Sequence, residues 1–566
     1  MNRTSQRSWS ARTAIVATVL AIVAAACGGS SSSSKKPSTA GSTTSVNVPN
    51  GGTLTIGAEQ EPDCADWIDS CAGTSWGTWT MEAQTMPRAF DMVSDNGDWV
   101  YRPSILLQGE PTLQTTPQQV VTYKINPAAK WSDGVPITSA DFKYTWDQIA
   151  HGQNIYDTTG YRNISSVDTP DPATAVVTFS ASYGGWKGLF GGEYGVFPSH
   201  ILQGKDRDSL MKDGYTWSGG PWLIQSWQKG TSVTLVPNPN YWGEKAHLDK
   251  VIFQFVPDTA SEFQAFRTGQ VQAIYPQPQP DAVAAIQAGL PDSNATYTAD
   301  TANLEALWFN NTKFPFDSKA VRQAVGYAID RNAVVQRLFG SLGVKTAMNT
   351  LDPPILKQFT DTNAWSQYKL DLSKVDSLMT ADGWVKGSNG IWAKGGKTAD
   401  IEMKTTADNK RRELTEQIIQ DQLKAAGFNV TTNNQKAGDL FGTQLPAGDF
   451  TVGLYADVAT QLDPQNCALF CSGNIPTAAN GNTGQNWQRV NIPPIDPLLT
   501  TVDTALDQST RATADQQAMK ILADNNVALP IDPLPNILLW SKRIVGDVSD
   551  NPIFSMFWNM NTWGLK

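Results

Sequence analysis

Strand and helix patterns alternate along the chain after residue 50, and this alternation limits the folds that are open to it. Residues 51–57 alternate as a strand does, and residues 120–150 predict a strand, a turn and a helix whose capping box begins at Thr138. Residues 218–258 predict three strands, which a helix and a further strand follow. Strands mixed with helices in this order predict α/β layers rather than a helix bundle or a β-sandwich.

The second half of the chain continues this pattern. Residues 314–340 predict two helices, with Asp317 and Asp330 as N-caps and Gly340 at the end of the second helix. Residues 409–432 predict a helix followed by a strand. With 566 residues the chain is too long for one hydrophobic core, so two or three domains are expected.

The first 26 residues have the pattern of a secretory signal peptide. Three arginines precede the apolar residues 13–26, a run shorter than the roughly 20 residues that cross a hydrocarbon core of about 30 Å. Residues 27–50 are rich in Ser, Thr and Gly and contain little that could be buried, so they predict a flexible tether. We therefore expect the body of the protein to fold outside the cytoplasm.

Cys27 stands at the junction between the apolar run and the tether. The stretch AAACGG, residues 24–29, resembles the lipobox of bacterial lipoproteins, although Ala24 stands where such sites usually have Leu. The resemblance implies cleavage before Cys27 and a diacylglyceryl group on its thiol, and several acyl chains on one residue give lasting membrane attachment. Cleavage at an ordinary signal site, with Cys27 incidental, is the alternative.

Four further cysteines form two close pairs, Cys64 with Cys71 and Cys467 with Cys471. In an exported protein an even set of cysteines predicts disulfides. Zinc is the rival interpretation, but these spacings do not match the usual zinc knuckles. The sequence does not fix the connectivity, and cross-pairing of the two regions remains open.

Signatures of catalysis are absent from the sequence. It contains three histidines and none of the HExxH, GxSxG, SxxK or GxxxxGK[ST] patterns, so we expect no enzyme activity, no metal and no cofactor. The net charge of −10 and the lack of basic clusters also argue against nucleic-acid binding. These observations favour a binding protein.

Four stretches carry a resemblance to a known family: residues 131–146, 219–243, 309–331 and 418–430. In these stretches the chain resembles the family 5 solute-binding proteins of bacterial ABC importers, the group of oligopeptide-, dipeptide- and nickel-binding proteins. The resemblance implies an α/β, two-lobe periplasmic-binding-protein type II fold (cluster C-like), with an extra domain inserted in the first lobe. The ligand would lie between the lobes, which close over it in a hinge motion.

The resemblance also implies domain boundaries. After the signal peptide (1–26) and the tether (27–50), the first lobe would comprise 51–85, 216–305 and 530–566, the extra domain 86–215, and the second lobe 306–529. The chain would cross the hinge near residues 308–311 and again near residues 530–535.

Five residues are our candidates for ligand contacts. In peptide-binding members of the family an Asp in a similar Ala-Asp context meets the α-ammonium of the ligand, which implies this role for Asp457. A solvated loop aspartate is the alternative. Tyr455 and Trp487 are expected to contribute from the second lobe. Glu59 and Trp67 lie in the loop after the first strand, which should face the cleft, and a disulfide in that loop would hold Trp67 in place.

The predicted function is that of a monomeric, lipid-anchored receptor on the extracytoplasmic face of the cell membrane. It would capture a peptide and deliver it to ABC permease subunits that work with cytoplasmic ATPases. The 20 tryptophans support an oligosaccharide as the rival ligand, whereas the three histidines make a nickel chelate or other metal ligand less favoured. From other classes, an extracytoplasmic hydrolase and a peptide-sensing receptor remain as alternatives.

Overall fold

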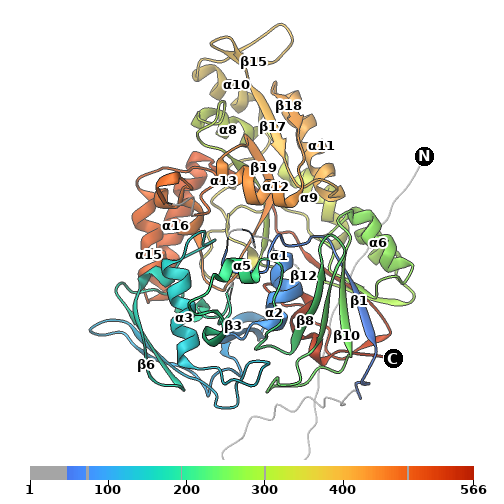
Figure 1. Ribbon diagram of the computed structural model, residues 1–566. Helices are drawn as coiled ribbons and strands as arrows, with labels where there is room; N and C mark the ends of the chain where they lie inside the picture. Colours follow the sequence, from blue (N-terminus) through green and yellow to red (C-terminus); the bar gives the residue numbers. More distant parts are fainter. Residues whose placement is uncertain (1–46, 70, 72–74, 193, 299–300, 481–483) are drawn as a thin grey trace, which may run out of the picture. The chain divides into compact units, whose positions relative to one another are not determined.

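The computed structural model describes residues 47–69, 71, 75–192, 194–298, 301–480 and 484–566 (Figure 1). The predicted signal peptide, Cys27 and nearly all of the predicted tether lie outside the described residues. None of the helices in the described ranges combines the length and the apolar character needed to cross a bilayer.

The first large sheet has seven strands that come from both ends of the chain and from its middle. Their order is β12-β21-β11-β1-β10-β9-β8, in which β1 runs parallel to β10 and β11 and the other pairs are antiparallel. The strands are β1 (Thr53–Ala58), β8 (Trp222–Gln228), β9 (Ser232–Pro237), β10 (Lys250–Phe255), β11 (Ala273–Ile274), β12 (Ser293–Thr298) and β21 (Asn536–Ser541). The alternation predicted for β1 appears as the fully buried Leu54 and Ile56.

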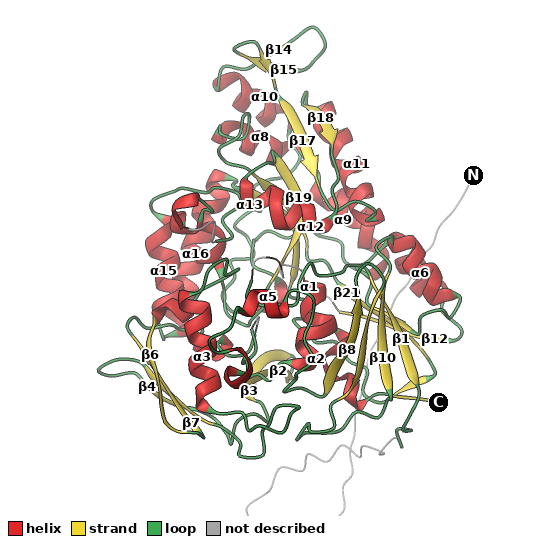
Figure 2. Cartoon of the chain, viewed as in Figure 1, coloured by secondary structure: helices red, strands yellow, loops and turns green. Residues whose placement is uncertain are grey.

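Two helices cover one face of this sheet, as Figure 2 shows for α6 (Thr259–Arg267) beside the yellow strands. The second is α7 (Pro280–Ala288). Phe263 and Phe266 of α6 pack in one buried cluster with Ile537 and Leu539 of β21. This cluster lies on the side of the sheet opposite the main core, which the other faces of β1 and β10 enter through Leu54, Ile56 and Phe253.

The second large sheet has five strands in the order β18-β17-β19-β13-β20. They are β13 (Asn303–Phe309), β17 (Asp400–Lys404), β18 (Asn429–Thr432), β19 (Val452–Val458) and β20 (Ala528–Asp532). Every residue of β13 is buried, because β19 and β20 flank it in the sheet and helices cover the sheet. Helices in this part of the chain are α8 (Lys319–Ala328), α9 (Arg331–Phe339), α11 (Lys410–Ala425) and α16 (Gln508–Asn525).

Helix caps in this region follow the sequence with one exception. The side chain of Asp330 accepts a hydrogen bond from the backbone nitrogen of Ala333, and Gly340 is the C-cap of α9. The N-cap of α8, however, is Ser318 and not Asp317. The predicted N-cap, Asp317, therefore lies one residue before the observed one, because Asp317 still belongs to the turn that precedes the helix.

A third sheet of four strands lies between β1 and β8 in the sequence. Its order is β4-β5-β7-β6, and the hairpin β2–β3 precedes it. The elements are β2 (Phe90–Asp95), β3 (Asp98–Pro103), β4 (Thr112–Gln114), β5 (Val120–Lys124), α3 (Ser139–His151), β6 (Ile164–Asp171) and β7 (Thr174–Phe179). The predicted capping box is present, with both Thr138 and Asp141 taking part.

The remaining elements are short, apart from α10 and α15, and α15 packs beside α16 (Figure 1). They are α1 (Ser75–Gly77), α2 (Ala83–Thr85), α4 (Ser199–Leu202), α5 (Arg207–Met211), α10 (Leu372–Ala381), α12 (Ala437–Asp439), α13 (Leu445–Ala447), α14 (Asn466–Phe470), α15 (Ile495–Thr504), β14 (Val385–Lys386), β15 (Trp392–Lys394), β16 (Lys397–Thr398), β22 (Ile544–Val545) and β23 (Gly564–Leu565).

The chain passes from the first large sheet to the second between Thr298 and Asn303, and it returns between Asp532 and Asn536. The sequence predicts the first hinge crossing near residues 308–311. The first passage between the two sheets lies before these residues. Trp308 instead lies inside β13, because its apolar neighbours complete a buried strand.

Candidate ligand-binding site

A cavity of about 170 Å³ is lined by residues that follow β1 and by residues of β19, α14 and the loops near them. Segments that follow strands of the first large sheet, and strands of the second large sheet, therefore each supply part of its wall. Four of the five predicted contact residues line it, namely Trp67, Tyr455, Asp457 and Trp487. The fifth, Glu59, does not.

Aromatic side chains form the wall on the side of the first sheet. Trp67, Trp76 and Trp79 line the cavity there, and the ring centroids of Trp76 and Trp79 lie 5.3 Å apart in an edge-to-face arrangement. The indole nitrogen of Trp67 donates a hydrogen bond of 2.7 Å to the hydroxyl of Tyr215. This bond fixes the indole ring of Trp67 and leaves its apolar surface for the cavity.

A second aromatic group forms the wall on the side of the second sheet. Trp308 stacks on Tyr455 with ring centroids 5.4 Å apart, and its indole nitrogen donates to the backbone carbonyl of Tyr455 at 2.9 Å. Trp487 lies next in this group, 6.2 Å from Tyr455 between centroids. All three side chains are buried, so the wall is rigid before any ligand enters.

Asp457 lies near the end of β19, where its strand pairs with Leu304 of β13. Its side chain is only partly exposed, and within the described ranges it forms no ion pair with Lys or Arg. Burial, together with the nearby charge of Asp352, raises the pKa of this carboxyl to about 7. A buried carboxylate without a cation is costly, so this position favours a positively charged partner.

Two other charged residues of the lining already have partners. Asp463 accepts from Arg511 at 2.5 Å, and Arg412 donates to Glu305 at 2.7 Å. Both pairs are largely shielded from solvent. Their charges are therefore neutralised within the protein, in contrast to that of Asp457.

Glu59 directly follows β1 and is 3% exposed. Its carboxylate accepts a hydrogen bond from the backbone nitrogen of Gln277 at 3.0 Å, and burial raises its pKa to about 7 despite the opposing charges of Arg411 and Arg412. Its neighbours Gln60 and Gln277 line the cavity. In this structure Glu59 thus holds the backbone of a lining residue, and direct contact with a ligand remains a prediction.

Disulfides join the cysteines within each close pair, which confirms the disulfide prediction and settles the connectivity. Cys64 bonds to Cys71 with Cα atoms 5.7 Å apart, and Cys467 bonds to Cys471 with Cα atoms 4.7 Å apart. Trp67 lies within the first closed loop. The second disulfide closes across α14, which contributes Ala468 and Leu469 to the lining.

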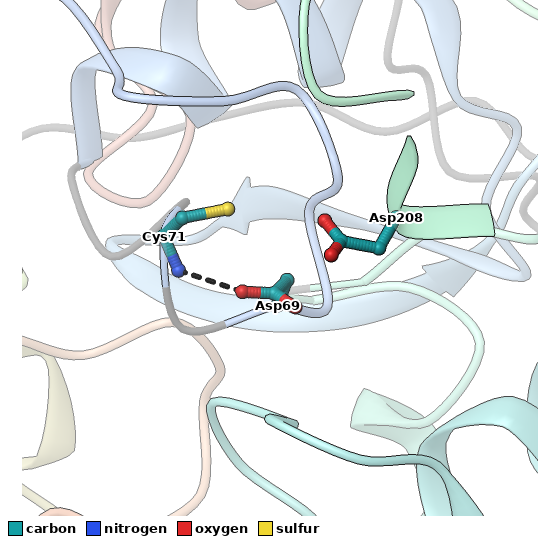
Figure 3. A group of neighbouring side chains, drawn as sticks. All are labelled: Asp69, Cys71 and Asp208. Carbon is teal, nitrogen blue, oxygen red and sulfur yellow. Dashed lines mark hydrogen bonds between the residues drawn. The ribbon is translucent and has the colours of Figure 1, made fainter. Parts of the chain in front are cut away.

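Figure 3 shows Cys71 near the carboxylates of Asp69 and Asp208. The Oδ1 atom of Asp69 accepts a hydrogen bond from the backbone nitrogen of Cys71 at 3.0 Å. The sulfur of Cys71 is bonded to Cys64 and is not available as a thiolate. This group of side chains therefore lacks the soft ligand that its composition suggests.

Asn466 and Gln488 are among the polar residues of the lining that sequence reasoning missed. Asn466 is the first residue of α14 and contacts the buried Asp352 and Asp515. Asp352 and Asp515 are distant from Asn466 in the sequence, so no local pattern predicts that these three side chains meet. The one available signal was the neighbouring Cys467–Cys471 pair, which marks α14 as a constrained segment.

Comparison with protein families gives one match. Residues 110–474 match the model described as "Bacterial extracellular solute-binding proteins, family 5 Middle". Among curated proteins, the oligopeptide-binding protein OppA of Lactococcus lactis subsp. lactis is 28% identical over 357 residues, which cover 56% of this chain and 58% of that protein. The nickel-binding periplasmic protein of Escherichia coli (strain K12) is 25% identical over 339 residues, covering 59% and 62%. The chain thus spans less than two thirds of the length of these relatives.

Solved structures show the fold. The oligopeptide-binding protein AppA of Bacillus subtilis, in complex with a nonapeptide, superposes with a TM-score of 0.81 at 18% identity over 92% of this chain and 100% of that chain. Such proteins have two lobes of mixed α/β structure, which confirms the predicted fold class. In this chain the seven-stranded sheet is the centre of the first lobe and the five-stranded sheet the centre of the second. The inserted extra domain and its boundaries remain a prediction.

Proposed function

Because this chain belongs to the bacterial extracellular solute-binding proteins of family 5, we propose that it captures a peptide between its two lobes and delivers it to the permease of an ABC importer. The observation that carries the proposal is Asp457, a largely buried carboxylate in the wall of an aromatic cavity. The α-ammonium of a peptide supplies the charge that this carboxylate lacks. Closure of the lobes by a hinge motion would exclude water and strengthen the attraction.

The size of the cavity supports a short peptide. Its volume of about 170 Å³ is below the roughly 300–1,000 Å³ that ligand pockets commonly have. The aromatic walls offer apolar surface to the first side chains of the peptide, and backbone groups of both lobes could hold its main chain. A longer peptide would require the lobes to stand further apart.

An oligosaccharide is the second candidate, and the tryptophans of the lining favour it. Trp67, Trp76 and Trp79 could stack on sugar rings. A sugar carries no positive charge, so its binding would not depend on Asp457. Removal of this carboxylate should therefore weaken the binding of a peptide and leave the binding of an oligosaccharide unchanged.

The test measures peptide binding with and without the charge at residue 457. Native mass spectrometry of gently purified protein first shows whether a ligand is carried along and what its mass is. We then expect Asp457→Asn to weaken binding of trialanine at least tenfold, a loss of about 1.4 kcal/mol or more. Binding of N-acetyl-trialanine, which has no ammonium group, should change less than twofold. Equal losses for both peptides would contradict the assigned role of Asp457.

We also propose that the protein is held at the extracytoplasmic face of the cell membrane by acyl chains on Cys27, with residues 27–50 as the tether. The support is the lipobox-like stretch at residues 24–29 and the apolar run before it. Cys27→Ser should release the protein into the soluble fraction after cell fractionation. Unchanged retention in the membrane fraction would contradict the lipid anchor.

A further inference from the structure

Asn466 is held by two buried carboxylates. Its side-chain nitrogen donates to the Oδ1 atom of Asp352 and to the Oδ1 atom of Asp515, at 2.8 Å in both cases. Asp352 and Asp515 are 0% exposed and Asn466 is 4% exposed. A side-chain amide has two hydrogens on its nitrogen, so both are used by these two acceptors. The orientation of the amide is thereby fixed, with its carbonyl oxygen directed away from both carboxylates.

The carbonyl oxygen of Asn466 is left free for a ligand. Asn466 lines the cavity, and no donor within the described ranges forms a hydrogen bond with its Oδ1 atom. The Oε1 atom of Gln488, a second lining residue, is also buried without a hydrogen-bond partner among the described residues. Together with the carboxylate of Asp457, these are three of the acceptors in the lining, and the carboxylate of Asp157 is another.

The one lining residue of the described ranges that carries a positive charge is already engaged within the protein. The guanidinium of Arg412, the cation of the lining, donates to Glu305 and to the hydroxyl of Thr406 at 2.8 Å. Two carboxylates that share one amide in a dry environment cannot both be ionised cheaply. Accordingly, burial and the charge of Asp352 raise the pKa of Asp515 well above its usual range. Asp352 and Asp515 thus act on the ligand only through the orientation that they impose on Asn466.

We propose that Asn466 is a specificity-determining residue, whose oriented carbonyl oxygen selects a ligand end rich in N–H groups. The chemical class is a primary ammonium or a guanidinium, in preference to a quaternary ammonium of the same charge. This inference rests on the proposed function, because it concerns the same cavity. It adds a requirement for hydrogen-bond donors to the requirement for positive charge at Asp457.

The test compares two peptides of equal charge. Trialanine carries three N–H donors at its amino end, and trialanine with an N,N,N-trimethylated amino end carries none. Isothermal titration calorimetry should show that the wild-type protein binds trialanine at least tenfold more tightly than the trimethylated form. In Asn466→Leu, which keeps the number of side-chain heavy atoms but removes the acceptor together with both amide donors, we expect this ratio to fall at least threefold. General damage to the site would weaken both peptides together and leave the ratio unchanged.

A second variant tests the orientation without changing Asn466. Asp515→Leu removes one of the two acceptors that hold the amide, and it also removes one member of a pair of buried carboxyl groups that disfavour each other's ionisation. We expect the ratio to fall in this variant as well. An unchanged ratio in both variants, or equal binding of the two peptides by the wild type, would overturn the role of Asn466 alone. Absence of binding of either peptide to the wild type would overturn the peptide function and, with it, this inference.

Discussion

The carboxyl group of Asp457 makes the stability of the fold depend on pH. Its pKa is raised from 3.8 to about 7, first by burial and then by the charge of Asp352. The folded state therefore binds this proton more tightly than the unfolded chain does. The stabilising contribution is complete below pH 4 and is lost as the pH rises to about 7, at a cost of about 1.4 kcal/mol for each pH unit in that window.

Removal of this charge should stabilise the ligand-free protein at high pH only. Asp457→Asn is neutral at every pH, so we expect its melting temperature at pH 8 to exceed that of the wild type by roughly 2–4 °C. At pH 4 the two proteins should melt together, because the wild-type carboxyl is then protonated. Thermal unfolding at both pH values, without ligand, measures the difference. A gain of equal size at pH 4 and pH 8 would contradict the link to ionisation.

At the residue scale, the structure can be compared with the predicted contact residues. Asp457 was predicted from the family context and Tyr455 was added beside it, and both lie on β19 in the cavity wall, where contact with a ligand stays a prediction. Glu59 was named from the correct loop, but its neighbour Gln60 is the residue that lines the cavity. A loop that follows a strand can turn either of two adjacent side chains toward the cleft, and the sequence does not distinguish them. Asn466 was missed because its partners lie 114 and 49 residues away.

At the scale of elements, local signals were the reliable ones. The capping box of α3 and the N-cap of α9 depend on contacts over three residues, so the sequence contains both partners of each contact. The passage between the sheets depends on which strands pair, and β13 pairs with β19 and β20, strands distant in the sequence. For that reason the first passage was placed several residues too late.

Asp141 joins helix α3 to the first residue of α4, and the loss of its carboxylate should strongly lower the free energy of unfolding. Its Oδ2 atom accepts from the backbone nitrogen of Thr138 at 2.8 Å, and its Oδ1 atom accepts from the backbone nitrogen of Ser199 at 2.7 Å and from its hydroxyl at 2.6 Å. Asp141 is 1% exposed, so Asp141→Ala leaves buried donors without a partner. We expect a loss of about 2–4 kcal/mol in the free energy of unfolding, measured with urea.

The matched control lies on the same helix. Asp147 pairs with His151 at 3.2 Å, and both side chains are largely exposed. Exposed pairs of this kind contribute little, so Asp147→Ala should change the free energy of unfolding by less than about 0.5 kcal/mol. Similar losses for the two variants would show that helix composition, and not the buried contacts of Asp141, determines the effect.

Loss of the disulfide Cys467–Cys471 should lower the affinity for a ligand as well as the stability of the fold. On the chain-entropy estimate a loop of this size contributes about 2 kcal/mol to stability. The bond also holds α14, which carries Asn466, Ala468 and Leu469 into the lining.

We expect the double change Cys467→Ser and Cys471→Ser to weaken trialanine binding roughly threefold to tenfold, because α14 must then be ordered by the ligand. Calorimetry at a temperature where the variant is fully folded separates the two effects. Unchanged affinity would assign the disulfide to stability alone.

At the scale of the whole molecule, Gly438 marks a close approach between the two lobes. This residue lies in α12 of the second lobe, and Asp63 follows β1 of the first lobe. A Cβ atom on Gly438 would lie 2.8 Å from Oδ2 and 2.9 Å from Oδ1 of Asp63. Both distances are shorter than a normal contact. Any larger residue at this position must therefore displace the Asp63 carboxylate or hold the lobes apart.

Gly438→Ala should consequently weaken ligand binding by disfavouring the closed state. We expect trialanine affinity to fall roughly threefold to tenfold, a loss of about 0.7–1.4 kcal/mol, and the radius of gyration of the liganded protein to increase in small-angle scattering.

Gly442→Ala is the matched control, because a Cβ there would lie 3.9 Å from Oδ2 of Asp63. Both changes raise helix propensity by about 1 kcal/mol, so only the contact with Asp63 distinguishes them. The additional change Asp63→Ala should restore the affinity of Gly438→Ala, since it removes the colliding carboxylate. If Gly438→Ala and Gly442→Ala bind trialanine equally well, closure does not depend on this contact.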